Sequence, residues 1–213
     1  MISLFPKDLK TVLCLGAHCD DIEIGCGGAI LRLVRDYPLL HVNWVVVSSD
    51  SRRAAEARRS ADAFLQHAAG RDVLIKEFRN GYFPAAGADI KDFFEEIKAS
   101  IRPDVIFTHY RNDLHQDHRL ISELTWNTFR NHVILEYEIP KYDGDMGTPN
   151  VYLPLPEALW RRKIATLMEC FPSQREKPWF TPETFAALMR LRGVESNADG
   201  GYAEAFYGRK LVL

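Results

Sequence analysis

No stretch of this sequence stays apolar for the roughly 20 residues that a membrane-spanning helix needs. The first residues, Met-Ile-Ser-Leu-Phe-Pro-Lys-Asp, lack the charged segment followed by an apolar core that marks a signal peptide. There are only four cysteines, and no two of them are spaced as Cys-x-x-Cys. These absences predict a cytoplasmic protein with reduced cysteines and no transmembrane segment.

The sequence also has no surplus of positive charge, since 27 Lys and Arg residues face 29 Asp and Glu residues, for a net charge of −2. A nucleic-acid partner is therefore not predicted. Hydrophobic residues make up 46% of the sequence and charged residues 26%, as is typical of soluble globular proteins. The sequence has no internal repeat, and its length predicts one domain that spans residues 1–213.

Apolar, β-branched runs alternate along the chain with segments whose apolar residues recur at helical spacing. Strands are predicted at 11–16, 41–48, 72–78, 103–109 and 133–139, and helices at 27–36, 53–68, 88–101, 118–131, 156–170 and 182–192. A loop is predicted at 140–149, and either a helical turn or an edge strand is predicted at 202–213. The alternation predicts an α/β, Rossmann-like three-layer fold, with a mostly parallel sheet and helices on both faces.

Two polar clusters follow predicted strands. Ala17-His18-Cys19-Asp20-Asp21 comes directly after the first strand, and His115-Gln116-Asp117-His118 comes after the fourth. In an open sheet of order 3-2-1-4-5, these two strands are neighbours at the switch point, where ligands bind beyond the carboxyl ends. The topology therefore predicts that the two clusters lie side by side.

The two clusters together contain the donors of a catalytic metal site. Zinc in such sites is usually held by three protein ligands and keeps an open position for water. His18, Asp21 and His118 would supply two imidazoles and one carboxylate. We therefore predict Zn²⁺ at these three residues, and another divalent ion such as Fe²⁺ would also suit them.

Three further residues of the clusters would then be available for acid–base chemistry. Asp20 can take a proton from a metal-bound water. His115, when protonated, would stabilise an oxyanion and later protonate a leaving amine. Asp117 could orient and charge-stabilise such a histidine. A metal, a base and an acid are the parts that amide hydrolysis requires.

Each motif also has a simpler interpretation. An Asp pair after a strand often caps a helix, and a His-x-x-His segment is often a solvated helix start; only the combination of both, at neighbouring strands, favours a site. Cys19 could bind a soft metal, but a small residue filling a tight turn is the commoner case. Gly25-Cys26-Gly27-Gly28 matches neither GxGxxG nor GxxxxGK. His109 is predicted only to end the fourth strand.

The two clusters resemble the motifs of the LmbE-like, or PIG-L, family of zinc-dependent N-deacetylases. The family's Pro/Ala-His-Pro-Asp-Asp motif stands here as residues 17–21, and its His-Pro-Asp-His motif stands as residues 115–118, with Cys19 and Gln116 in place of prolines. The resemblance covers about residues 11–140 and implies a Rossmann-like fold. It implies the same site: zinc at His18, Asp21 and His118, Asp20 as the general base, and His115 as the oxyanion-stabilising or acid histidine, supported by Asp117.

Substrate contacts are less well defined by the sequence. Arg53 and Glu56 are similar to a family Arg-x-x-Glu pair whose Arg can reach a substrate oxygen, although a solvated Arg–Glu helix pair would look the same. Tyr137 and Lys141 belong to a region that resembles bacterial family members. Aromatic and basic residues near a site suit a sugar, and we predict that Arg53, Tyr137 and Lys141 bind the substrate.

The leading hypothesis is a metal-dependent hydrolase that removes the acetyl group from an N-acetylated amino sugar, of the N-acetylglucosamine type, or from its conjugate. One alternative is a nucleotide-binding oxidoreductase on the same fold, but its glycine motif is replaced by the acidic pair. A second alternative is a non-catalytic sugar- or metal-binding module, which would lack a base or an acid. The predicted partner is a small molecule, and the oligomeric state is left open.

Overall fold

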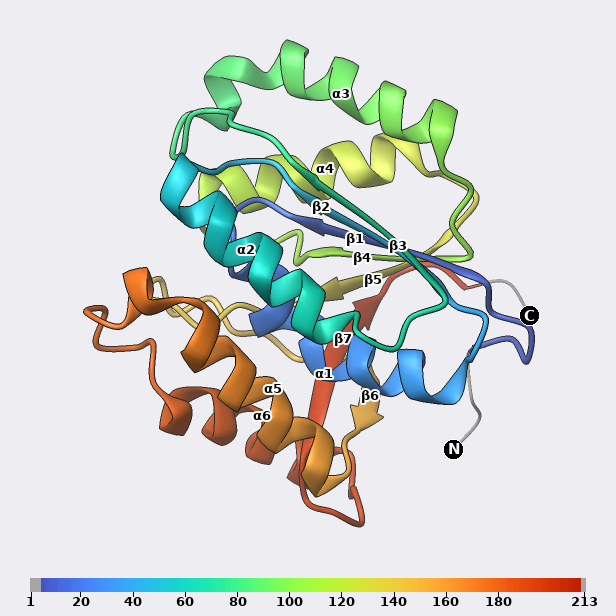
Figure 1. Cartoon of the computed structure of the whole chain (residues 1–213), viewed down its shortest axis with the longest axis vertical. Helices are drawn as coiled ribbons and strands as arrows, with labels where there is room; N and C mark the ends of the chain where they lie inside the picture. Colours follow the sequence, from blue (N-terminus) through green and yellow to red (C-terminus); the bar gives the residue numbers. More distant parts are fainter. Residues whose placement is uncertain (1–4, 212–213) are drawn as a thin grey trace.

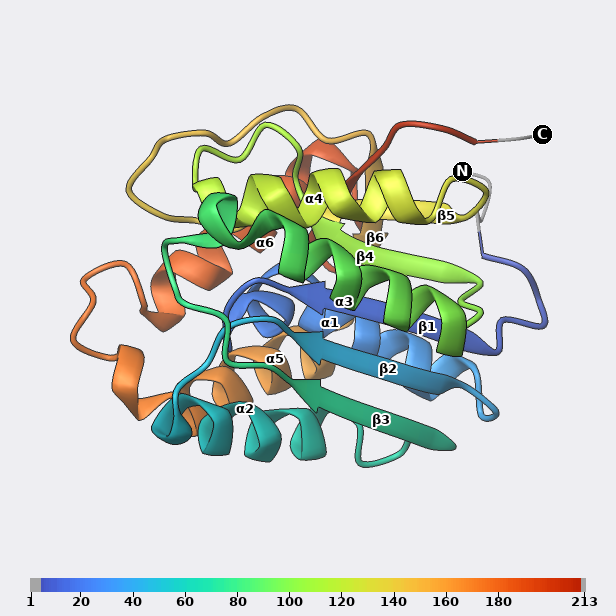
Figure 2. The same cartoon turned by 90° about the horizontal axis from the view of Figure 1, so that it is seen from above.

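Seven strands form one mixed sheet in the order β3-β2-β1-β4-β5-β7-β6 in the computed structural model, which describes residues 5–211 (Figure 1). The strands are β1 (Thr11–Gly16), β2 (His41–Val46), β3 (Gly70–Ile75), β4 (Val105–His109), β5 (Val133–Tyr137), β6 (Val151–Pro154) and β7 (Ala203–Gly208). Strands β1 to β5 pair in parallel, and β7 pairs antiparallel with both β5 and β6. Seen from above, the arrowheads of β1 to β4 point the same way, so their carboxyl ends share one edge (Figure 2). The predicted fold class and the order 3-2-1-4-5 are confirmed.

Helices cover both faces of the sheet. They are α1 (Asp21–Asp36), α2 (Ser51–Phe64), α3 (Gly87–Ser100), α4 (Gln116–Thr128), α5 (Glu157–Cys170) and α6 (Pro182–Glu195), with short 3₁₀ turns η1 (Phe83–Ala86) and η2 (Pro172–Gln174). Helices α3 and α4 pack on one face, and α1, α2, α5 and α6 lie on the other (Figure 1). Successive strand residues alternate between the two cores, so that Cys14 faces α1 and its neighbour Leu15 faces α3 and α4.

Helix α1 begins six residues earlier than predicted, at Asp21. The glycines of this segment made a loop the more natural expectation, because glycine weakens an isolated helix. Here they permit close packing instead. A Cβ on Gly25 would lie 2.1 Å from Cδ2 of Tyr137, and a Cβ on Gly28 would lie 2.5 Å from Cδ1 of Leu155. The early start places the Asp20–Asp21 pair at the helix N-terminus, where the helix dipole favours negative charge.

The strands β6 and β7 differ most from the prediction. Residues 151–154 were not predicted as a strand, because four residues ending in proline carry little strand signal. Residues 203–208 do form a strand, but β7 lies between β5 and β6 and is not at the edge. The last part of the predicted segment, residues 212–213, lies outside the described residues.

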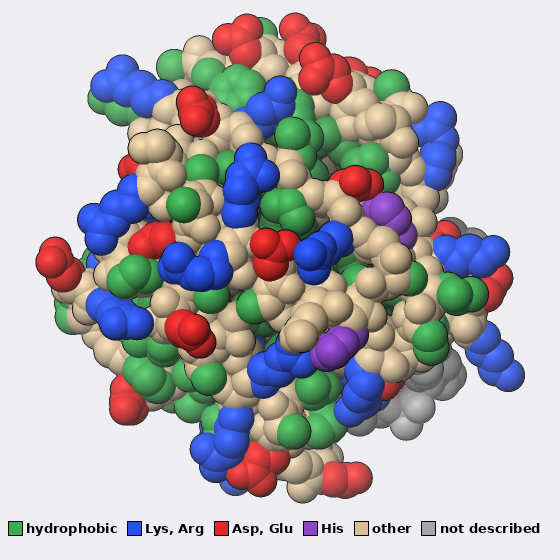
Figure 3. All heavy atoms as spheres, viewed as in Figure 1, with side chains coloured by type: hydrophobic (Ala, Val, Ile, Leu, Met, Phe, Trp, Pro, Cys, Tyr) green, Lys and Arg blue, Asp and Glu red, His purple; other side chains and the backbone are tan. Residues whose placement is uncertain are grey.

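The surface carries charges of both signs. On the face seen in Figure 3, Lys and Arg side chains are interspersed with Asp and Glu side chains and with apolar ones. Of the helices between residues 5 and 211, none is both long and apolar enough to cross a membrane.

Candidate active site

The site forms where β1 and β4 end side by side. The loop after β1 carries His18 and leads into α1, whose first residue is Asp21. The backbone N–H of His18 donates a hydrogen bond of 2.6 Å to Oδ2 of Asp21, which fixes this tight loop. His115 caps the N-terminus of α4, and His118 lies in its first turn. The topology thus brings the two clusters together, as the sequence predicts.

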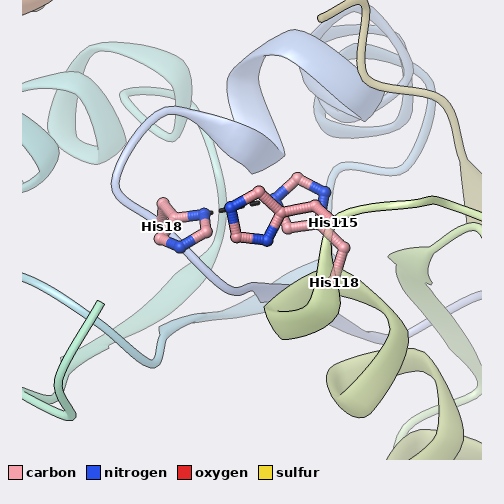
Figure 4. Close-up of side chains that lie close together, drawn as sticks. All are labelled: His18, His115 and His118. Atoms are coloured by element: carbon pink, nitrogen blue, oxygen red, sulfur yellow. Dashed lines mark hydrogen bonds between the residues drawn. The ribbon is translucent and has the colours of Figure 1, made fainter. Parts of the chain in front are cut away.

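Three side-chain atoms converge at the floor of the site. Nδ1 of His18 lies 3.1 Å from Nε2 of His118 and 3.4 Å from Oδ2 of Asp21. Nε2 of His118 and Oδ2 of Asp21 are 3.6 Å apart. Donors bound tetrahedrally to zinc at bond lengths of about 2.0–2.2 Å are about 3.3–3.6 Å apart. The donor set therefore fits a zinc ion. The close approach of His18 and His118, with His115 beside them, is visible in Figure 4.

Both histidines of this set are oriented by a carboxylate behind them. Nε2 of His18 lies 3.2 Å from Oδ2 of Asp117, and Nδ1 of His118 lies 2.9 Å from Oδ2 of Asp113. Metal-binding histidines characteristically show this arrangement, in which the far ring nitrogen is held by a carboxylate. The acidic residue behind His118, Asp113, was not singled out by the sequence. Its signal is weak, because it is one polar residue in a polar loop.

Asp117 does not support His115 in the way predicted. Its carboxylate accepts backbone hydrogen bonds from Gly81, at 2.6 Å, and from Phe83, at 3.1 Å, besides contacting His18. Only its backbone N–H reaches His115, donating to Nδ1 at 3.2 Å. The reason is geometric: as the second residue of α4, Asp117 directs its side chain toward the loop before η1.

His115 lines the same pocket as the candidate metal-site residues, in surroundings that disfavour the protonated ring. Burial, together with the positive charges of His118 and His18, lowers the pKa of His115 to about 4. The ring is therefore neutral at pH 7. Because Nδ1 accepts the hydrogen bond from Asp117, the proton of the neutral ring is assigned to Nε2. His115 can thus donate a hydrogen bond without first being protonated.

Asp20 lines the same pocket as the candidate metal-binding set and is held by Arg53. One carboxylate oxygen of Asp20 accepts a hydrogen bond of 2.7 Å from Nη2 of Arg53. The Asp20 side chain makes no capping bond to α1, so the simpler helix-cap interpretation does not describe it. Nor are Arg53 and Glu56 a solvated pair, since Glu56 is buried and bonds to Ser173.

Two of the predicted substrate contacts have other partners. Tyr137 is completely buried beneath α1, and its hydroxyl donates to the carbonyl of Leu15 at 2.6 Å. This placement does not fit a substrate contact. Lys141 does line the pocket, but its ammonium group contacts Asp145 and lies 3.0 Å from Oδ2 of Asp113. Its charge is therefore already compensated.

His109, predicted only to end a strand, packs directly against the site. Its ring stacks on His118 with centroids 3.9 Å apart, and its Nε2 lies 3.2 Å from Oδ2 of Asp21. Asp21, His109 and His118 form one set of possible metal donors, and His18, His115 and His118 form another. However, Nε2 of His109 accepts the backbone N–H of Ala17 at 2.9 Å. This bond leaves the nitrogen unsuited to binding a metal.

The donor set opens into a pocket of about 200 Å³. Its walls include Asn80, Tyr142 and Asp143, and also Lys177 and Trp179 from the segment after η2. The lining thus combines charged and imidazole groups with two aromatic side chains, Tyr142 and Trp179. This combination suits a ligand with one reactive polar group and a larger body.

Comparison with known families agrees with this geometry. Residues 13–129 match the model of the PIG-L family, described as GlcNAc-PI de-N-acetylase. The match spans more than half of the chain and includes both histidine–aspartate clusters. This chain therefore belongs to the PIG-L/LmbE deacetylase family.

Solved structures share the fold across nearly the whole chain. The N,N′-diacetylchitobiose deacetylase from Pyrococcus horikoshii is 20% identical, with a TM-score of 0.68 over 94% of this chain and 84% of that one. The A40926 pseudoaglycone deacetylase Dbv21 is 18% identical, with a TM-score of 0.69 over 95% and 97%. The 4-carboxy-2-hydroxymuconate hydratase GalB from Pseudomonas putida KT2440 is 17% identical, with a TM-score of 0.71 over 96% and 98%. At these identities the likeness shows the fold alone.

Proposed function

We propose that this protein is a zinc-dependent hydrolase that removes the acetyl group from an N-acetylated amino sugar or its conjugate. The observation that carries the proposal is the convergence of His18, Asp21 and His118 with donor separations of 3.1–3.6 Å. Membership of a deacetylase family supports the reaction type. The chitobiose deacetylase and the pseudoaglycone deacetylase that share the fold act on molecules consistent with this substrate class.

The residues around the donor set have complementary roles in amide hydrolysis. Bound zinc supplies Lewis acidity and lowers the pKa of water to about 7. Asp20 takes the proton of the water that attacks the acetyl carbon. His115 donates its Nε2 proton in a hydrogen bond to the acetyl oxygen as negative charge develops there. When the C–N bond breaks, Asp20 returns the proton to the leaving nitrogen, and the products are acetate and the free amine.

The oxidoreductase alternative conflicts with the start of α1. In dinucleotide-binding folds, the pyrophosphate sits at the N-terminus of the helix after the first strand. Here the carboxylates of Asp20 and Asp21 lie at that position and would repel it. A metal cation is the ligand that these two carboxylates favour.

The proposal is tested by incubating the zinc-loaded and the chelator-treated protein with N-acetylglucosamine, N,N′-diacetylchitobiose and nucleotide- or lipid-linked N-acetyl sugars. We expect equal amounts of acetate and free amine, released only by the metal-loaded protein. The hydratase substrate 4-carboxy-2-hydroxymuconate serves as a comparison. Its hydration, with no acetate release from any sugar, would replace this proposal by a different reaction on the same fold.

A further inference from the structure

The end of α5 and the segment 171–181 that follows it are tied to α2 by partly buried polar contacts. Glu56, 4% exposed, accepts a hydrogen bond of 3.0 Å from the backbone N–H of Ser173 and another from the Ser173 hydroxyl. One turn further along α2, Arg59 donates a bond of 2.6 Å to the carbonyl of Cys170. A buried carboxylate with two donors from one residue fixes the position of η2.

The same helix also holds the proposed general base. Arg53, one turn before Glu56, pairs with Asp20 at 2.7 Å. Residues three apart on a helix lie on the same side, so α2 joins Asp20 and segment 171–181 through adjacent side chains. The distance between the base and this segment is therefore set by a rigid element.

The far end of the segment reaches the pocket. Lys177 and Trp179 line the same cavity as His18 and His115. Trp179 is partly exposed, and its ring packs edge-on against Phe180, with centroids 5.8 Å apart; Phe180 is itself buried. The ammonium group of Lys177 lies 5.3 Å from the centroid of the Trp179 ring. Where it lines the pocket, the indole offers an apolar surface with one hydrogen-bond donor.

We infer that Trp179 is a specificity-determining residue that contacts the sugar ring beyond the acetamide, and that Glu56 is its positioning residue. The inference rests on the proposed function, because the donor set must hold the acetamide for the ring to extend toward the rim. The pyranose ring has apolar C–H faces, which suit an aromatic surface. Of the two aromatic residues of the pocket, Trp179 is partly buried and packed against Phe180, whereas Tyr142 is 74% exposed. Glu56 acts through Ser173 and touches no substrate.

The first test compares Trp179→Ala and Trp179→Phe in the zinc-loaded protein with N,N′-diacetylchitobiose. Loss of the ring should raise KM roughly 10- to 100-fold with little change in kcat, because the contact is made equally in the ground and transition states. Phenylalanine should restore most of the affinity, and the zinc content should stay at one ion. An unchanged KM in Trp179→Ala, with normal turnover by the wild type, would overturn the inference and leave the proposed function intact. Absence of turnover by the wild type would count against the proposed function instead.

A second test measures binding without turnover. In an Asp20→Asn background, N,N′-diacetylchitobiose should change the tryptophan fluorescence. Adding Trp179→Phe should remove this change, whereas adding Trp126→Phe, the same substitution on α4, should preserve it. A signal that survives Trp179→Phe would contradict contact between the indole and the sugar.

The positioning role of Glu56 is tested by Glu56→Ala and Glu56→Gln. Glu56→Ala should raise KM several-fold, as Trp179→Ala does. Glu56→Gln keeps one acceptor oxygen and should therefore raise KM less. Glu157→Ala, which removes an exposed α5 carboxylate that pairs with the exposed Arg161, is the matched control and should leave KM unchanged. A Glu56→Ala variant with lower thermal stability but wild-type KM would show a purely structural role and overturn the positioning role. If Glu56→Ala does not fold, the KM of Glu56→Gln is compared with that of the wild type instead.

Discussion

At the scale of the residue, the site is a set of paired groups in which almost every charge has an assigned neighbour. His18 and His118 each contact a carboxylate on the far side of the ring, at 3.2 and 2.9 Å. Asp20 forms an ion pair with Arg53, and Asp113 forms one with Lys141. The near nitrogens of the two imidazoles face one oxygen of Asp21, which also accepts the backbone N–H of His18, and these three side-chain atoms form the metal site we propose.

We predict that His18→Ala and His118→Ala each lower zinc affinity by more than about 100-fold, because outer partners of metal ligands alone are worth 10- to 100-fold. Zinc content measured by mass spectrometry after dialysis against trace chelator checks this. The exposed His67, changed to alanine, is the control and should keep its zinc. Wild-type zinc occupancy in both site variants would contradict the ligand assignment.

The adjacent carboxylates should respond differently to the same change. Asp20→Asn should keep zinc and lose turnover by about 10²–10⁴-fold, the usual contribution of a positioned general base. Asp21→Asn should lose zinc affinity first, because Asp21 supplies one of the three converging atoms. Zinc titration and steady-state kinetics on both variants distinguish the two roles. The reverse pattern would mean that the roles are exchanged.

At the scale of the element, α1 shows why local pattern was an incomplete guide. Its glycine-rich first half has low intrinsic helix propensity, and the sequence placed the helix start at residue 27. The helix forms because Gly25 lets it lie against the ring of Tyr137. The same contact explains why Tyr137 is unavailable to a substrate. A sequence pattern does not contain this information, which depends on two elements far apart in the chain.

We therefore predict that Gly25→Ala destabilises the protein by roughly 1–3 kcal/mol, the usual cost of overpacking a core. Its Cβ would lie 2.1 Å from Cδ2 of Tyr137, a buried ring with no room to move. Gly87→Ala, at the start of α3, is the matched control: its Cβ would meet nothing within 4 Å. Chemical denaturation of both variants measures the difference. If Gly25→Ala and Gly87→Ala are equally stable, α1 and β5 can move apart to accommodate the added methyl group, and the prediction is wrong.

At the scale of the whole molecule, the strand order and the meeting of the two clusters could be predicted because both depend on short-range patterns and one topological rule. Five strands in their correct order were enough to place His18 near His118. The residues that contact the far side of the metal-site histidines could not be predicted. Asp113 and His109 become part of the site only through the turn of the loop after β4 and the stacking of one ring on another, and Asp117 faces His18 because of the direction of the first turn of α4.

The whole arrangement also sets the pH dependence of metal binding. Burial alone would lower the pKa of His18, but the charge of Asp21 and the hydrogen bond to Asp117 raise it to about 9 in the metal-free protein. Below this pH, a proton competes with the metal for the ring. Apparent zinc affinity should therefore rise with pH by up to about tenfold per unit and level off above about pH 9. Competition titrations against a chelator of known affinity at several pH values check this; affinity that does not change across the neutral range would contradict it.

The position of β7 has a consequence for how the molecule is made. β7 follows every other described strand and helix in sequence, yet it lies inside the sheet, and β6 pairs with β7 alone. During synthesis on the ribosome, the outer edge of β5 and the whole of β6 have no strand to pair with until residues 203–208 emerge. An unpaired edge of this kind is a target for aggregation during synthesis. The final closing of the sheet should therefore be a late, long-range step in folding, most sensitive to sequence changes in β7.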